Sequence, residues 1–329
     1  MAMTLNDMKV GMNDKVAQQV VDIFVRESEI LQALPFDNCI SPDGGSTLTY
    51  TYMQTLLPAV AAFRALNTEY TANEATMVKR SADLKIFGGK FSMDRVLKQA
   101  EGRYNNMAFQ MEQKILAAVG LFHYTLINGD ASTDPLEFDG LDKMLAGTTS
   151  EFNSTGAIDV STAAKLKENA DQLYEALQNL IKATSADALL MNAAMISKIQ
   201  TLARILGYKT DSEEAFGRKI TTMDGIRFMD LKNVYSVNES KPLATPCVPI
   251  VTREIDSAST TGLTDIYAVR FNVNDGFHGV TLTGTSGISQ YVPDFTKPGA
   301  VKDGEVEMVA ATVLKNTAHA GVLRNIKLM

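Results

Sequence analysis

The chain has 329 residues, 45% of them hydrophobic and 21% charged, a composition that excludes a disordered protein and allows one large or two moderate cores. Its formal net charge of -7 argues against a dedicated nucleic-acid-binding module, because an acidic surface repels phosphate. Cys39 and Cys247 lie far apart without zinc-type spacing, which argues against a disulfide framework and predicts two buried thiols in a reducing compartment.

The N-terminal residues do not form a secretory signal, because Asp7 and Asp14 interrupt any apolar stretch there. No later segment approaches the roughly 18 consecutive apolar residues that a membrane helix needs. We therefore expect a soluble protein made in the cytoplasm, without membrane association.

The first segment predicts an amphipathic arm. Asn13 or Asp14 can cap a helix whose apolar residues recur at helical spacing, namely Val16, Val20, Ile23, Phe24 and Leu31. Pro35 and the sequence SPDGGS at 41–46 then break the chain. The Thr- and Tyr-rich sequence at 46–56, STLTYTYMQTL, predicts a strand.

Residues 63–90 predict an extended, solvated hairpin and no part of a core. Residues 69–71 and 76–78 suit its two limbs, and no apolar periodicity holds for long. Its charged residues include Glu69, Lys79, Arg80, Asp83 and Lys85. A segment this long with so little apolar content is either a mobile loop or an arm that becomes ordered on another surface.

A very long helix is predicted from an N-cap at Ser92 to Gly129. Its apolar positions recur every three or four residues, at Val96, Ala100, Tyr104, Met107, Met111, Ile115, Val119 and Leu126. Some thirty-five residues at about 1.5 Å each span roughly 50 Å, so such a helix has to cross a wide, flat body.

The sequence at 127–141, INGDASTDPLEFDGL, is rich in acids that suggest a divalent metal site. Asp130, Asp134 and Asp139 could bind a hard cation, because carboxylates at short spacing on a loop suit one. Their spacing matches no EF-hand, and Pro135 interrupts it. A metal-dependent enzyme built on these three residues stays as one alternative.

The favoured interpretation of the same segment is a structural turn. Asn128 and Gly129 end the long helix, and Asp130 and Ser132 cap local turns. The apolar residues expected to pack this turn into the core are Leu136, Phe138 and Leu141.

The second half alternates helices and strands, which predicts an α+β or α/β body. A helix is expected at 163–183, a short buried strand at 188–191, and a helix at 193–206 that ends at Gly207. Later strands are expected at 226–228, 247–251, 265–271, 279–283 and 306–314.

The usual catalytic motifs are missing from the sequence. His123, His278 and His319 are isolated, no GxSxG elbow occurs, and neither cysteine has a histidine nearby in sequence. The GGKFS sequence at 88–92 lacks the first Gly of a phosphate loop and is interpreted as a turn before the long helix. We therefore expect no catalytic residue, no cofactor and no bound metal.

The order of these elements, together with several local sequences, resembles the major capsid protein family of tailed double-stranded DNA phages. This is the HK97 fold, shared with encapsulin shells. The sequence at 126–141 is similar to the family's turn from its spine helix into the body. Further similar segments are SADALLMNAAMISKIQTL at 185–202, DIYAVRF at 265–271, GVTL at 279–282 and AHAGVLRNIKL at 318–328.

The resemblance implies an α+β, HK97-like capsid fold in five segments. These are an N-terminal arm (1–45), a strand and extended E-loop hairpin (46–91), the spine helix of a peripheral domain (92–134), a mostly axial α/β domain (135–260), and return strands of both domains (261–329). It also implies a function without catalysis. Copies would self-assemble as pentamers and hexamers into an icosahedral shell that encloses the genome of a virion, built in the host bacterial cytoplasm.

The implied partners are further copies of the chain, a separate scaffolding protein, a portal and a decoration protein, with packaged DNA held only non-specifically. Many members carry an N-terminal scaffolding segment, whereas the arm predicted here begins within about fifteen residues of Met1. The candidate inter-subunit contacts are Glu69, Lys79, Arg80 and Lys85. An encapsulin-type compartment around an enzyme cargo is the alternative with the same fold.

Overall fold

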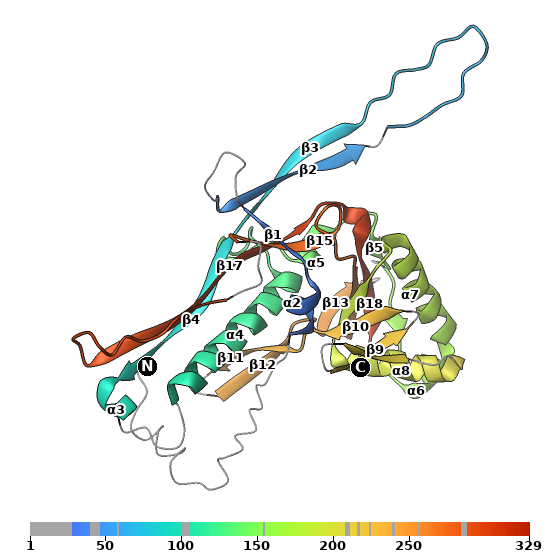
Figure 1. The fold of residues 1–329 in the computed structure, drawn as a ribbon. Helices are drawn as coiled ribbons and strands as arrows, with labels where there is room; N and C mark the ends of the chain where they lie inside the picture. Colours follow the sequence, from blue (N-terminus) through green and yellow to red (C-terminus); the bar gives the residue numbers. More distant parts are fainter. Residues whose placement is uncertain are drawn as a thin grey trace.

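The computed structural model describes residues 28–39, 47–57, 59–99, 106–153, 155–207, 211–215, 218–223, 225–238, 241–255, 257–283 and 288–329. Two packed bodies and one projecting hairpin make up this part of the chain (Figure 1). A long two-stranded ribbon with a helix beside it forms one body. A sheet covered by three helices forms the other.

The ribbon pairs strand β4 (Lys85–Asp94) with strand β17 (Val301–Leu314), antiparallel along ten residues of each strand, with Lys85 opposite Ala310. It belongs to a five-stranded sheet in the order β1-β15-β17-β16, with β4 paired to β17. The other strands are β1 (Phe36–Asn38), β15 (Phe277–Thr281) and β16 (Ser289–Tyr291). Helix α4 (Asn106–Asn128) packs against β4 and β17 and buries Phe122 and Leu126 in a common core.

The predicted helix start at Ser92 is wrong. Ser92 lies inside β4, which alternates buried Phe91 and Met93 with more exposed neighbours, and only a short helix α3 (Arg95–Gln99) follows. Pairing with β17 decides this, since backbone hydrogen bonds to a partner strand override a local helical pattern. The described spine helix α4 has 23 residues, about 35 Å, while residues 100–105 lie outside the described part.

The second body is a nine-stranded sheet in the order β5-β18-β14-β7-β10-β9-β8, with β13 paired to β14 and β6 paired to β18. Its strands are β5 (Glu151–Phe152), β6 (Ile158–Asp159), β7 (Ala188–Met191), β8 (Asp211–Ala215), β9 (Arg218–Met223), β10 (Ile226–Asp230), β13 (Val251–Ile255), β14 (Ala258–Val269) and β18 (Ala320–Lys327). Its helices are α6 (Ala163–Glu168), α7 (Ala170–Thr184) and α8 (Ala193–Leu206).

Strand β7 shows why this sheet is buried on both faces. Successive side chains of a strand point to opposite faces. Leu189 and Met191 join a core with helices α6, α7 and α8, while Ala188 and Leu190 join the core that contains α4. The prediction of a short, fully buried strand at 188–191 is confirmed.

Two predicted elements of this body need correction. The single helix expected at 163–183 is two helices, because Asn169 leaves helical geometry (φ −99°, ψ 15°) and serves as both the end of α6 and the start of α7. The strand expected at 247–251 is a turn up to residue 250, and only Val251 begins a strand. Cys247 and Val248 are apolar there because they fill the core. The helix at 193–206 is confirmed, with Gly207 at φ +77° as its C-cap.

The remaining described elements connect the two bodies. The predicted arm helix lies mostly outside the described residues. At its end Ser28 is extended and caps a separate short helix, α2 (Glu29–Ala33). A hairpin of β11 (Asn233–Asn238) and β12 (Lys241–Pro246) lies beside α4. Helix α5 (Leu141–Leu145) follows the acidic turn, and the 3₁₀ helix η2 (Thr317–His319) precedes β18.

Candidate assembly surfaces

A hairpin of β2 (Thr49–Leu57) and β3 (Thr76–Asp83) projects from the body (Figure 1). The strands pair antiparallel from Thr49 opposite Asp83 to Leu57 opposite Thr76. The predicted second limb at 76–78 is part of β3, but the first limb is the strand predicted at 46–56. Residues 85–90, expected to belong to the hairpin, lie in β4 and pair with β17. Leu84 and Phe87 pack in the core, so the expectation that residues 63–90 form no part of a core is wrong there. Residues 69–71, expected to be a limb, have no regular structure.

The tip of this hairpin, residues 59–75, exposes large apolar side chains. Phe63 is fully exposed, Leu66 is 88% exposed and Val60 is 67% exposed. The hydrogen bonds and ring contacts that order the tip are internal, such as Val60 N donating to Asn73 Oδ1 at 3.0 Å. Several large apolar side chains left exposed within one short segment suggest a binding surface for another protein.

The base of the hairpin, in contrast, is fastened to the body. The hydroxyl of Tyr50 donates to Asp37 Oδ2 at 2.7 Å, and Leu84 N donates to Leu48 O at 2.7 Å. Burial raises the pKa of Tyr50 and its hydrogen bond to Asp37 raises it further, so the phenol stays protonated and donating. Burial by itself would raise the pKa of Asp37, but the bond from Tyr50 contributes to a net decrease.

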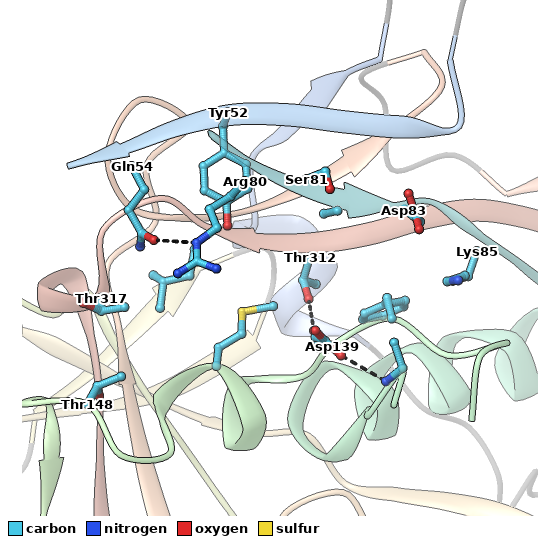
Figure 2. A pocket seen from close by; sticks show the side chains of 15 residues that line it. Tyr52, Gln54, Arg80, Ser81, Asp83, Lys85, Asp139, Thr148, Thr312 and Thr317 are labelled. Atoms are coloured by element: carbon cyan, nitrogen blue, oxygen red, sulfur yellow. Dashed lines mark hydrogen bonds between the residues drawn. The ribbon is translucent and has the colours of Figure 1, made fainter. Parts of the chain in front are cut away.

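A groove of about 430 Å³ lies between the hairpin and the body (Figure 2). Tyr52, Gln54 and Arg80 line it from the hairpin, and Met144 and Thr312 line it from the body. The wall is mixed in polarity, so the groove is not a closed apolar cavity.

The four candidate contact residues are divided between this groove and the outer hairpin. Arg80 lines the groove, and its Nε donates to Gln54 Oε1 at 3.3 Å. Lys85 also lines it, but its Nζ donates to Pro135 O at 2.8 Å within the same subunit. Glu69 lies in the tip and Lys79 on β3, both exposed. Their role between subunits stays a prediction.

The acids of the sequence at 127–141 are held by groups of the turn and by Lys143 of helix α5. Lys143 Nζ lies 2.5 Å from Asp130 Oδ1 and 2.8 Å from Asp139 Oδ1. Hydrogen bonds from Lys143, Thr133 and the backbone lower the pKa of Asp130. Asp134 Oδ1 accepts from the backbone of Leu136 at 2.9 Å. An ammonium group therefore already lies between two of the three carboxylates proposed as metal ligands.

The two glycines of this turn are needed for close backbone approach. Gly140 N donates to Gly129 O at 2.8 Å, and a Cβ at Gly129 would lie 2.2 Å from Phe138 O. Phe138 and Leu141 are buried as predicted, whereas Leu136 is 79% exposed, so its expected burial is wrong.

The other residues considered for chemistry have structural partners. His123 Nε2 lies 2.7 Å from Ser28 Oγ, and both cysteines are buried thiols outside any disulfide, as predicted. Residues 88–92 form part of β4, so the predicted turn there is wrong, and Lys90 pairs with Asp303 at 2.8 Å. Within the described part of the chain, no three His, Cys, Asp or Glu side chains are placed to hold a metal, and no helix could cross a membrane.

The sequence interpretation missed a buried ionic cluster around Arg324. This guanidinium pairs with Asp142 of α5, with Glu151 at 2.8 Å and with Asp265 at 3.1 Å. Arg253 makes a bidentate pair with Asp265, in which Nη1 donates to Oδ1 at 2.6 Å and Nη2 donates to Oδ2 at 2.5 Å. A lone arginine inside the apolar strand AGVLRNIK was the signal that could have revealed it.

No family model matches the sequence, and no curated protein matches it either. Solved structures do match. A chain of the holo-SrpI encapsulin complex from Synechococcus elongatus PCC 7942 aligns with a TM-score of 0.59 at 13% identity, over 99% of this chain and 98% of that one. A Mycobacterium phage Bobi chain aligns with a TM-score of 0.55 at 12% identity, over 99% of both chains. The capsid of a native GTA particle aligns with a TM-score of 0.54 at 10% identity, over 92% of both chains.

These alignments extend over nearly the whole chain, so they include the projecting hairpin, the ribbon with its spine helix and the nine-stranded sheet together. The shared order of elements agrees with the resemblance that the local sequences suggested. The chain has the HK97-like fold of capsid and encapsulin shell proteins.

Proposed function

We propose that this chain is the major capsid protein of a tailed double-stranded DNA bacteriophage, assembling as pentamers and hexamers into the icosahedral shell around the genome. It acts as the container and catalyses no reaction. The observation that carries this proposal is the hairpin tip, whose apolar side chains find no burial in their own subunit. In a chain with this fold, adjoining copies are the natural place for that burial.

The geometry supports head-to-tail contacts. The protruding tip of the hairpin and the groove between the hairpin base and the body give different surfaces to the two members of a contact. Such heterologous contacts close into rings when the rotation between copies allows it. With the N-terminal arm and hairpin included, each contact should bury at least about 1,000 Å², the size expected of a stable interface.

The remaining assignments rest on the same proposal. Residues 1–45 would act as an arm, 46–91 as the E-loop segment, 135–260 mostly as the axial domain, and 261–329 as return strands. The spine helix of the segment 92–134 corresponds to α4. Partners would be a separate scaffolding protein, a portal and a decoration protein, with assembly in the host bacterial cytoplasm. The net charge of -7 suits a wall that encloses DNA and holds it only non-specifically.

Glu69, Lys79, Arg80 and Lys85 are proposed to contact neighbouring subunits. Glu69 and Lys79 carry opposite charges at exposed positions on the hairpin, so each can pair with a complementary charge on the next copy. Arg80 and Lys85 lie at the groove where a neighbour's segment could enter. Arg80 and Lys85 already make hydrogen bonds within their own subunit. A contact with a neighbour would therefore replace these hydrogen bonds and would not simply add new ones.

The test is electron microscopy and sedimentation of the purified full chain, alone and with the scaffolding gene from its genome. Capsomers or closed particles are expected. A matched variant replaces residues 58–75 by a two-residue Asn-Gly turn between β2 and β3. It should keep the folded subunit and lose the particles, since the tip contacts no core. A wild-type chain that stays monomeric at high concentration with its scaffold would contradict the proposal.

An encapsulin-type compartment is the second candidate, and the alignment with the holo-SrpI encapsulin over 99% of this chain favours it. Terminase and portal genes beside the coding sequence would support the phage capsid. A cargo enzyme gene, and particles that copurify with that enzyme, would support the compartment. The metal-dependent enzyme at Asp130, Asp134 and Asp139 is not proposed, because Lys143 already pairs with two of these residues. Measurable heats of calcium, magnesium or manganese binding in titration calorimetry would support the metal-dependent enzyme again.

A further inference from the structure

Tyr50 fastens the hairpin to the body through three separate elements. Its hydroxyl donates to Asp37 of β1. Its ring meets the imidazole of His278 from β15 edge-on, at 5.9 Å between centroids. The ammonium of Lys315, just after β17, lies 5.4 Å from the centre of the same ring. Because Tyr50 is near the start of β2, these contacts hold the hairpin at the point where it leaves the body.

His278 lies in an unusual environment within this cluster. It is completely buried in β15, between β1 and β17. Its Nδ1 is 3.4 Å from Gly276 O, and its Nε2 has no hydrogen-bond partner among the described residues. The titratable and charged groups that surround the cluster in the described chain are Asp37, Cys39, Tyr50, Tyr52 and Lys315.

Adding a proton to His278 would conflict with this arrangement. The imidazolium would carry an N–H at both ring nitrogens, and a buried N–H without an acceptor is costly. It would also lie near the ammonium of Lys315. Asp37 could neutralise it, but that carboxylate already accepts the hydrogen bond of Tyr50. Withdrawal of Tyr50 would both free Asp37 and open the imidazole to water.

We propose that Tyr50, Asp37 and His278 form a proton-sensitive latch that holds the hairpin base while His278 is neutral and releases it when His278 becomes protonated. The latch is a property of one subunit and does not rest on the shell function. Its consequence is that the angle between hairpin and body depends on pH. The exposed apolar tip of the hairpin is thereby repositioned by one proton.

The electrostatics agree with this direction. Burial lowers the pKa of His278, and the charge of Lys315 lowers it further, to about 4, against 6.5 for an ordinary imidazole. With the hairpin released, the solvated imidazole would regain its usual pKa. The latched state therefore binds fewer protons. The equilibrium constant that favours the latched over the released hairpin is largest above pH 6.5. It decreases about tenfold per pH unit between pH 6.5 and 4, and it is constant below pH 4.

The experiment is hydrogen–deuterium exchange by mass spectrometry on the full chain, at several values from about pH 7.5 to about pH 4.5, corrected for intrinsic exchange rates. The readout is the protection of amides in residues 48–54 and 80–84 relative to strand β7, which lies in the deep core. Light scattering at each pH verifies that the oligomeric state is constant. Hairpin-base protection should fall roughly 30-fold or more across this range while β7 stays protected.

Three variants separate the latch from general acid sensitivity. His278→Gln cannot be protonated and should show no such fall. Lys315→Met removes the repelling ammonium and so raises the pKa of the latched imidazole toward that of the released one, which should make the fall smaller. This variant tests the idea even if His278→Gln does not fold. His319→Gln is the matched control, since this histidine lies outside the cluster, and it should behave as wild type. Constant wild-type protection, or a fall of unchanged size in Lys315→Met, overturns the latch. Neither result bears on particle formation.

Discussion

Arg324 is a charged residue that the folded chain encloses almost completely, with 7% of its surface exposed. It connects β18 to α5, β5 and β14 through Asp142, Glu151 and Asp265. These elements are far apart in sequence, so this one side chain joins the acidic turn region to the central sheet. The positive charge of Arg324 compensates the negative charges of these carboxylates, since burying unpaired charges is costly.

Replacement of Arg324 by Met should lower the free energy of unfolding by about 1–3 kcal/mol, because Glu151 loses this charged partner and the buried Asp265 keeps only Arg253. Urea denaturation followed by circular dichroism measures this. Lys165→Met is the matched control, since the pair of Lys165 with Glu168 is on the surface and its loss should leave the midpoint unchanged. Equal effects of the two replacements would show that the cluster does not stabilise the fold.

Gly129 is a second residue with a specific structural requirement. A methyl group there would meet Phe138 O at 2.2 Å and Thr125 O at 2.6 Å, both backbone atoms that cannot move alone. Gly129→Ala should therefore destabilise the chain by about 1–3 kcal/mol through forced backbone displacement. Gly156→Ala is the control, because its nearest neighbour is a side-chain atom at 3.1 Å. Thermal unfolding of both variants measures the difference, and equal melting temperatures would contradict the role of Gly129.

At the scale of elements, the hairpin divides into a fastened base and a free tip. Tyr50 and Tyr52 pack against the main core, whereas the residues of the tip do not. The hydrophobic contribution of the tip to the lone subunit is therefore small, and its contribution to association can be large.

The double replacement Phe63→Ser and Leu66→Ser should leave the unfolding midpoint of the subunit within experimental error, because both side chains are in water. The same variant should assemble poorly or not at all, since the apolar surface for the neighbour is removed. Sedimentation velocity and calorimetry on one preparation measure the two effects. Normal particles from this variant would mean that the tip does not carry the contact.

The spine helix shows where local pattern and pairing compete. Apolar residues recur at helical spacing from Val96 onward, yet residues 88–94 alternate equally well as a strand. Strand β17 lies more than 200 residues later in the sequence, and its continuous backbone hydrogen bonds to residues 85–94 favour the strand over the helix there. A long-range partner of this kind is not visible in the local sequence.

At the scale of the whole molecule, the net charge of -7 opposes association of identical copies. If assembly buries the apolar tip against neighbours, salt should favour it by screening this repulsion. We expect the yield of particles to rise as ionic strength increases from about 0.05 to about 0.5 M. Light scattering against salt concentration measures this. A fall in yield would instead indicate that ion pairs of the hairpin, such as those proposed for Glu69 and Lys79, dominate the contact.

The sequence alone determined the elements whose burial and ends are local properties. These include the buried strand at 188–191, the helix at 193–206 with its glycine cap, and the acidic turn with its two glycines. It also determined that residues 63–75 could not be a core element, because their composition cannot bury enough apolar surface. Hydrophobic periodicity and turn chemistry are readable within a few residues, which is why these predictions hold.

Only the tertiary structure decided which strand forms the first limb of the hairpin, where the spine helix begins, and which charges are buried together. Arg324 meets Asp142 across more than 180 residues, and His278 meets Tyr50 across more than 220. Such groupings depend on how the sheets stack and pair. The free energy of a buried charge or a strand edge is set by partners that the neighbouring sequence does not contain.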